Sequence, residues 1–181
     1  ALHPTARLTH AHRPEAAVGE RLITAAFVVL LAAQLLVGVV FGSIQTGTTV
    51  LATDAGQAGI AGLVHACLGV GSVVAGLAVA ALPARFGYAS RVLVAAVGLA
   101  VLSLPLLVTD TVPQLFVVVL VLGFVVAPYM ISVFMLGERA APVQRVGAAM
   151  TLLAGATGIG YAVGSATAGR LADLHGHPGA F

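Results

Sequence analysis

The chain contains little charge and no lysine. Only 8% of its 181 residues are Asp, Glu, Lys or Arg, and all eight basic residues are arginines. A soluble domain usually has about 25% charged residues, whereas 60% of the residues here are hydrophobic. These proportions exclude an ordinary water-soluble domain and indicate an integral membrane protein.

Cysteine and targeting signals are also scarce. The single cysteine, Cys67, lies among apolar neighbours, which favours a packing role over redox or metal chemistry. No segment has the order of a secretory signal, in which an apolar region follows a basic start and precedes a small-residue cleavage site. Because the chain also lacks an initiating Met, we expect it to begin inside a longer gene product, with residues 1–20 forming a cytoplasmic linker.

Five long apolar stretches follow this linker. Each falls within or near the 17 to 25 residues that cross a hydrocarbon core of about 30 Å at about 1.5 Å per residue. The sequence therefore predicts an all-α, polytopic bundle of five transmembrane helices over residues 21–181. The stretches are Leu22 to Ser43, Gln57 to Leu82, Val92 to Val108, Pro113 to Leu136 and Val146 to Gly169.

The few charges predict the orientation. If successive loops alternate across the membrane, seven arginines share one side: Arg7, Arg13, Arg21, Arg85, Arg91, Arg139 and Arg145. The other side receives three acidic residues and one basic residue: Asp54, Asp110, Asp173 and Arg170. Cytoplasmic loops are enriched in Arg and Lys, so we expect a multi-pass plasma membrane protein with a cytoplasmic N-terminus. The basic residues are too dispersed for nucleic-acid binding.

An internal repeat links the second stretch to the fifth. A shift of 89 residues places Leu63, Gly69, Gly71, Leu82 and Gly87 on Leu152, Gly158, Gly160, Leu171 and Gly176. The same shift is expected to place the first stretch on the fourth. Since three crossings separate the copies, they would enter the membrane from opposite sides, as in the inverted three-helix repeats of secondary transporters. A sixth helix would then follow the chain.

Small residues recur at every fourth position on three of the stretches. The rows are Gly38, Gly42 and Thr46; Ser72, Gly76 and Ala80; and Ala156, Gly160, Gly164 and Ala168. Such rows allow helix backbones to approach closely in lipid. They could serve packing within the bundle or a sliding surface against another half of the protein. On the second interpretation, Gly76, Gly160 and Gly164 should lie on an exposed face.

Three connections resemble those of the major facilitator superfamily. The segment 83–91 is similar to that family's G-x-L-A-D-R-x-G-R-R loop and keeps Arg85, Gly87 and Arg91, although Ala84 replaces the acidic residue. Residues 169–173, together with Gly176, resemble the start of the same motif. Residues 138–147 resemble the connection between the family's tenth and eleventh helices.

This resemblance implies helices seven to eleven of a twelve-helix transporter. It further implies a solute carrier that works by alternating access, as a proton-coupled efflux or uptake permease. The expected partners are a small-molecule solute, the lipid bilayer and a missing N-terminal half. No cofactor or metal is implied.

Polar residues inside the apolar stretches are the candidates for contact with a solute, because such groups are costly in a membrane. They are Gln34, Gln45, His65, Tyr129, Ser132, Thr157 and Tyr161. His65 is the ionisable side chain well inside a span, and it could carry a proton. It could equally be a histidine bonded to a helix carbonyl, and Tyr129 could serve aromatic packing. Pro128 should bend the fourth helix beside Tyr129.

Other classes of protein find less support in the sequence. Ser72 and His65 could suggest an intramembrane protease, but seven residues along a helix separate them by about 10 Å, beyond hydrogen-bond reach. Charged rings and filter-like loops, which would indicate a channel, do not occur. A membrane structural or interaction domain remains the alternative to a transporter. Polar residues around one shared cavity would favour transport, whereas the same residues satisfied in a closed core would favour a scaffold.

Overall fold

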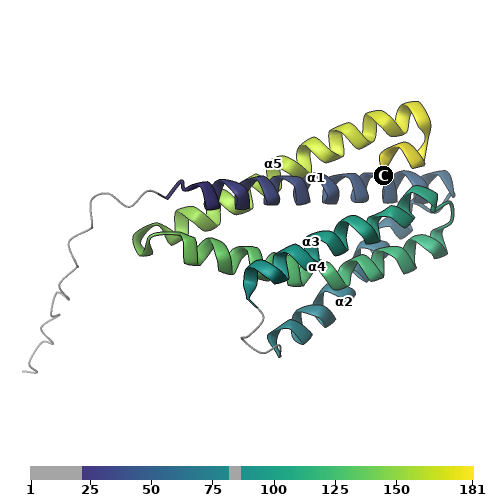
Figure 1. Ribbon diagram of the computed structural model, residues 1–181. Helices are drawn as coiled ribbons and strands as arrows, with labels where there is room; N and C mark the ends of the chain where they lie inside the picture. Colours follow the sequence, from purple (N-terminus) through teal and green to yellow (C-terminus); the bar gives the residue numbers. More distant parts are fainter. Residues whose placement is uncertain (1–21, 82–86) are drawn as a thin grey trace, which may run out of the picture.

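A computed structural model describes residues 22–81 and 87–181, and all regular structure in these ranges is helical. The long helices are α1 (Ala25–Asp54), α2 (Ala61–Ala80), α3 (Tyr88–Ser103), α4 (Val112–Ala140) and α5 (Val146–His175). Short 3₁₀ helices are η1 (Ala58–Ile60), η2 (Leu104–Val108), η3 (Val143–Arg145) and η4 (His177–Ala180). Figure 1 shows the elongated bundle that they form. The predicted linker and Arg85 lie outside the described residues.

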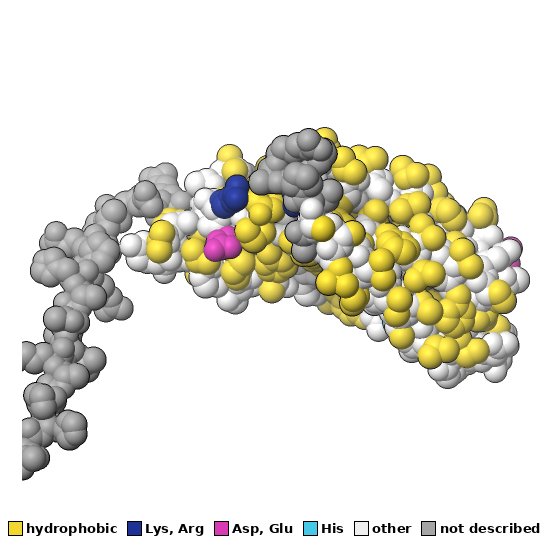
Figure 2. Space-filling model, turned by 90° about the horizontal axis from the view of Figure 1, so that it is seen from below, with side chains coloured by type: hydrophobic (Ala, Val, Ile, Leu, Met, Phe, Trp, Pro, Cys, Tyr) yellow, Lys and Arg dark blue, Asp and Glu magenta, His cyan; other side chains and the backbone are white. Residues whose placement is uncertain are grey.

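Five helical segments in the described part of the chain are long and apolar enough to cross a membrane. The predicted all-α bundle with five candidate spans is therefore confirmed. Much of its surface is apolar, as Figure 2 shows for one face. Exposed Val and Leu side chains would be unfavourable in water, but they match the hydrocarbon core of a bilayer.

Helix α1 extends well past its predicted end at Ser43, to Asp54. Polar residues in this extension remain helical because their side chains bond within the helix. The hydroxyl of Thr49 donates to the carbonyl of Gln45 at 2.9 Å, and that of Thr53 donates to the carbonyl of Thr49 at 2.7 Å. Such bonds to the preceding turn satisfy a hydroxyl without lipid or water. At its other end, the Thr24 hydroxyl caps the helix by accepting from the Phe27 backbone N–H at 3.2 Å.

Two glycine crossings hold the bundle together, one between α1 and α5 and one between α2 and α4. At the first, a Cβ on Gly38 would lie 3.0 Å from the Cα of Gly160 and closer still to the Thr157 carbonyl. At the second, a Cβ on Gly123 would lie 3.0 Å from the Cα of Gly71 and closer to the Leu68 carbonyl. Only glycine permits this approach of two backbones.

The residues that meet at the two crossings are related by constant offsets in the sequence. Gly71 and Gly160 are 89 residues apart, and so are the contacted carbonyls of Leu68 and Thr157. On the partner helices, 85 residues separate Gly38 from Gly123, and the carbonyls of Leu35 and Leu120, contacted at the two crossings, are also 85 apart. One symmetry relation therefore exchanges α1 with α4 and α2 with α5. The expectation that a shift of 89 also relates α1 to α4 is wrong by four residues, about one helical turn.

The exchanged helices run in opposite directions. Figure 1 shows α1 and α4 lying along the bundle with reversed chain direction. Helix α4 is central, because its buried residues recur every three or four positions along its length: Val112, Leu115, Val119, Leu122, Val126, Tyr129 and Val133. Helix α3 packs on the outside of α4, where the side chain of Val125 lies within 2.9 Å of a Cβ placed on Gly98.

The prediction that Gly76, Gly160 and Gly164 lie on an exposed face is wrong. Gly160 and Gly164 are buried, since both pack on α1 next to the carbonyls of Leu35 and Val39. Gly76 is half-buried, and a Cβ there would lie 3.5 Å from the Ala127 Cβ of α4. The rows of small residues pack against other helices of the same bundle, and their spacing alone does not show which helix that is. In the described part of the chain they serve packing within the bundle.

Candidate functional site

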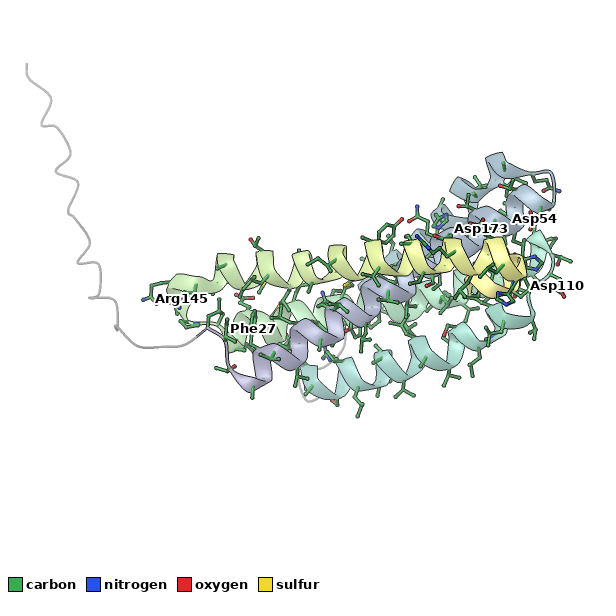
Figure 3. All side chains as sticks on the ribbon, turned by 90° about the horizontal axis from the view of Figure 1, so that it is seen from above. Phe27, Asp54, Asp110, Arg145 and Asp173 are labelled. Atoms are coloured by element: carbon green, nitrogen blue, oxygen red, sulfur yellow. The ribbon has the colours of Figure 1, made fainter. Side chains whose placement is uncertain are left out.

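Charge is separated between the two ends of the bundle. Figure 3 places Arg145 at one end, with Asp54, Asp110 and Asp173 at the other. At the Arg145 end, the guanidinium groups of Arg91 and Arg139 lie 5.3 Å and 4.5 Å from the centre of the Tyr88 ring. Glu138, beside Arg139, and Arg170, near Asp173, are exceptions, but the excess of arginine at one end and of aspartate at the other agrees with the alternation of loops that the sequence predicts.

A cluster of one histidine and two carboxylates at the acidic end joins three segments. The Nδ1 atom of His177 lies 3.8 Å from an oxygen of Asp54, and its Nε2 atom lies 3.3 Å from an oxygen of Asp110. Next to it, the ring of Phe181 packs against Gly47 of α1. The cluster connects the end of α1, the loop before α4 and η4. Sequence reasoning missed His177, since nothing in its neighbourhood marks it as a contact to distant carboxylates.

Gln34 joins the two helices that the repeat exchanges. Its side chain is fully buried, and its Nε2 donates to the sulfur of Met130 on α4 at 3.8 Å. Its Oε1 has no hydrogen-bond partner among the described residues. A buried amide with one bond to a weak acceptor is a costly feature, on the order of 1–3 kcal/mol for the unmatched oxygen.

Unpaired buried hydroxyls gather on the same two helices. Within the described ranges, Tyr129 and Ser132 of α4 and Thr48 of α1 are buried, and no partner bonds their hydroxyl oxygens. Helices α1 and α4 thus each bring two incompletely satisfied polar side chains into the core. Thr48 was missed from the sequence, although it follows the apolar spacing of Gln34, Val37, Ile44 and Leu51 on the buried face of α1.

The remaining polar candidates are satisfied locally or at the surface. The Tyr161 hydroxyl on α5 donates to the amide oxygen of Gln45 on α1, and both residues are exposed. The Thr157 hydroxyl donates to the Leu153 carbonyl of its own helix at 3.1 Å. Ser165, which sequence reasoning did not single out, donates to the Gly42 carbonyl at 3.3 Å. The bonds of Tyr161 and Ser165 add polar contacts to the α1–α5 crossing.

His65 is bonded on one side only. Its Nδ1 atom lies 2.7 Å from the carbonyl of Ala61, one turn earlier in α2. Since a carbonyl can only accept, Nδ1 carries the hydrogen, and in the neutral ring Nε2 has a free lone pair. That Nε2 is buried without a partner among the described residues. The bond to the Ala61 carbonyl matches the interpretation of His65 as a histidine bonded to a helix carbonyl, here one of its own helix.

The predicted residues do not surround one described hollow. A hollow of about 490 Å³ lies between α2, α3 and α4, and one of about 300 Å³ is lined by Leu22, Ile23, Arg145 and Leu152. Of the described residues that were predicted to contact a solute or form the motif-like loop, only Arg91 lines either hollow. Within the described ranges, no group of three or more His, Cys, Asp or Glu side chains could hold a metal ion.

Comparison of the chain with models of protein families, with curated proteins and with solved structures finds no match. The class of the protein here is thus the one that its helices define, a multi-pass membrane protein. Its function has to be argued from its own contacts.

Proposed function

We propose that this chain is the C-terminal half, through the fifth helix, of a secondary active transporter of the major facilitator type in the plasma membrane. The observation that carries this proposal is the exchange of the α1–α5 and α2–α4 crossings by one symmetry relation. Inverted repeats of three helices are a device of transporters, in which two related elements rock around a central site. The basic end of the bundle is then cytoplasmic.

The buried polar groups support a site between α1 and α4. Gln34, Tyr129 and Ser132 all have unpaired oxygens, and Gln34 of α1 bonds Met130, which lies between Tyr129 and Ser132 in the sequence of α4. Thr48 also has an unpaired oxygen, but it lies about 21 Å further along α1 and does not belong to the same site. Polar atoms in a membrane core are usually retained for a function, because an apolar side chain would be more stable there. We infer that Gln34, Tyr129 and Ser132 bond a small solute when α1 and α4 separate in another state of the transport cycle.

The test is solute-driven proton movement by the full-length protein in liposomes, followed with a trapped pH dye across a panel of small solutes. We expect Gln34→Leu to reduce the signal by about five- to ten-fold, since a lost hydrogen bond to solute contributes about 1–1.5 kcal/mol. The mutant should unfold at the same or a higher temperature, because the replacement removes an unmatched amide. Gln114→Leu, at an exposed glutamine, is the matched control and should leave transport unchanged.

A membrane structural domain is the second candidate. It is favoured by the bonds from Gln34 to Met130 and from Tyr161 to Gln45, which join helices within the described bundle. If the bundle is a scaffold, no solute in the panel moves protons, and Gln34→Leu changes stability alone. Solute-driven flux that is lost in Gln34→Leu and kept in Gln114→Leu would exclude the scaffold.

A further inference from the structure

The chain folds back on the bundle after α5. Gly176 turns it with a φ of 74°, a conformation that favours glycine. The η4 helix that follows packs against α5, α1 and η2. Ala180 is buried, and the Phe181 ring packs on Gly47 of α1. Residues 177–181 therefore form a strap at the acidic end of the bundle, beside the C-terminus in Figure 1.

His177 is the polar anchor of this strap. As described above, one ring nitrogen lies near a carboxylate oxygen of Asp54 and the other near one of Asp110. Asp54 is the last residue of α1, and Asp110 precedes α4, so the ring lies between the ends of the two helices that the repeat exchanges. The His177 side chain is 23% exposed. It can therefore exchange protons with water.

The position of the ring matches its protonated form. Both nitrogens of an imidazolium carry a hydrogen, whereas the neutral ring has one N–H and one lone pair. A neutral His177 could donate to one of the two carboxylates, and its lone pair would face the oxygen of the other. Loss of the proton would also remove the cation that lies between Asp54 and Asp110. The strap is therefore held most firmly when His177 is charged.

The other charged groups around the strap do not take part in these pairs. Besides Asp54 and Asp110, the segments packed against η4 carry three such side chains near the acidic end, all from the last turns of α5: Arg170, Asp173 and His175. All three are exposed, and within the described ranges no ion pair joins them to His177. Histidine is the residue whose side chain ordinarily changes charge between about pH 5 and 8. His177 is the histidine that pairs with carboxylates in the described part of the chain.

We propose that His177 is a proton-dependent clamp on the strap. When protonated, it holds residues 177–181 between the end of α1 and the start of α4. When it loses its proton, the strap leaves these helix ends more often, although Phe181 and Ala180 still favour the docked position. Protonation of a histidine at an interface is a known way to bias such a two-state element. The clamp does not depend on solute transport.

The reactivity of a buried thiol tests the clamp. Ala180→Cys is made in the full-length protein without other cysteines, and its rate of reaction with a water-soluble maleimide reports how often the strap opens. Gln57→Cys, at an exposed position near the end of α1, is the reference. The ratio of the two rates removes the pH dependence of the thiol itself. We expect this ratio to rise by about five-fold from about pH 5.5 to about pH 8, which corresponds to an ion-pair contribution of about 1 kcal/mol.

Substitutions in the Ala180→Cys protein identify the groups responsible. His177→Gln cannot become charged, so its ratio should be high at both pH values. His177→Arg keeps a cation, so its ratio should be low at both. Asp54→Asn and Asp110→Asn should each raise the ratio at about pH 5.5. Asp173→Asn, at an exposed carboxylate of α5 that forms no ion pair with His177, is the matched control and should not change it.

Three results would overturn the clamp. The first is a ratio that does not change with pH in the Ala180→Cys protein, or that still changes with pH after His177→Gln. The second is an effect of Asp173→Asn as large as that of Asp110→Asn. The third is a ratio for His177→Arg at about pH 5.5 that is as high as that for His177→Gln. Each of them would leave the strap held by Ala180 and Phe181 without a contribution from the charge of His177.

Discussion

The polar residues of this bundle differ in whether their side chains have hydrogen-bond partners. Threonines such as Thr49 and Thr157 bond their own helix and need no other partner. Gln34, Thr48 and Ser132 are fully buried, yet each keeps an unpaired oxygen among the described residues. Sequence could show that Gln34 and Ser132 interrupt apolar spans. It could not show that Met130 lies opposite Gln34, because that contact depends on how α1 and α4 pack.

His65 gives the prediction at this scale. Its Nδ1–H bond to Ala61 fixes the ring and leaves Nε2 as the basic atom. Imidazole is the side chain whose charge most readily changes near neutral pH. If the protein transports a solute as proposed, we expect His65→Ala to flatten the pH dependence of transport by the full-length protein, by a several-fold change at one end of the range, with normal expression. His175→Ala, at an exposed histidine, is the control. Unchanged uptake across pH would leave His65 with a packing role.

At the scale of elements, sequence predicted the helices better than their ends and partners. Length and hydropathy identified five spans, since the hydrocarbon core sets both. The first apolar stretch was predicted to end at Ser43, whereas α1 continues to Asp54, and threonine hydroxyls in its last turns bond to carbonyls of the same helix. The sequence showed the glycine rows, but it could not show which helix packs against Gly160. Spacing predicts a close crossing without naming the second helix.

The α1–α5 crossing is tested by Gly160→Leu. A side chain there meets the Leu35 carbonyl and the Cα of Gly38, which cannot move away without separating the helices. We expect a loss of about 3 kcal/mol or more of stability, at the upper end of the usual overpacking effect. Thermal unfolding in detergent, followed by circular dichroism, measures it. Gly158→Leu, on the same helix with open space around it, should unfold like the parent protein. Equal stability of the two variants would contradict the crossing.

For the whole molecule, two independent features point to the same arrangement in the membrane. The glycine crossings relate α1 and α2 to α4 and α5 with reversed direction, and this needs an odd number of crossings between the copies. The charges separate to opposite ends of the same bundle, as Figure 3 shows. Neither feature depends on the other, because the crossings lie inside the apolar core and the charges lie at its ends.

The sidedness of the molecule follows if the arginine-rich end is cytoplasmic. Single cysteines at Ser90 and Gln144 should then react with a membrane-impermeant maleimide only in inside-out vesicles of the full-length protein. A cysteine at Asp110, in the loop at the other end, should react only in intact cells. All three positions are exposed, so lack of reaction cannot be attributed to burial. Because Cys67 is the one native cysteine in this chain, Cys67→Ala is the background for these variants. Labelling of Gln144→Cys in intact cells, with Asp110→Cys protected, would reverse the proposed topology.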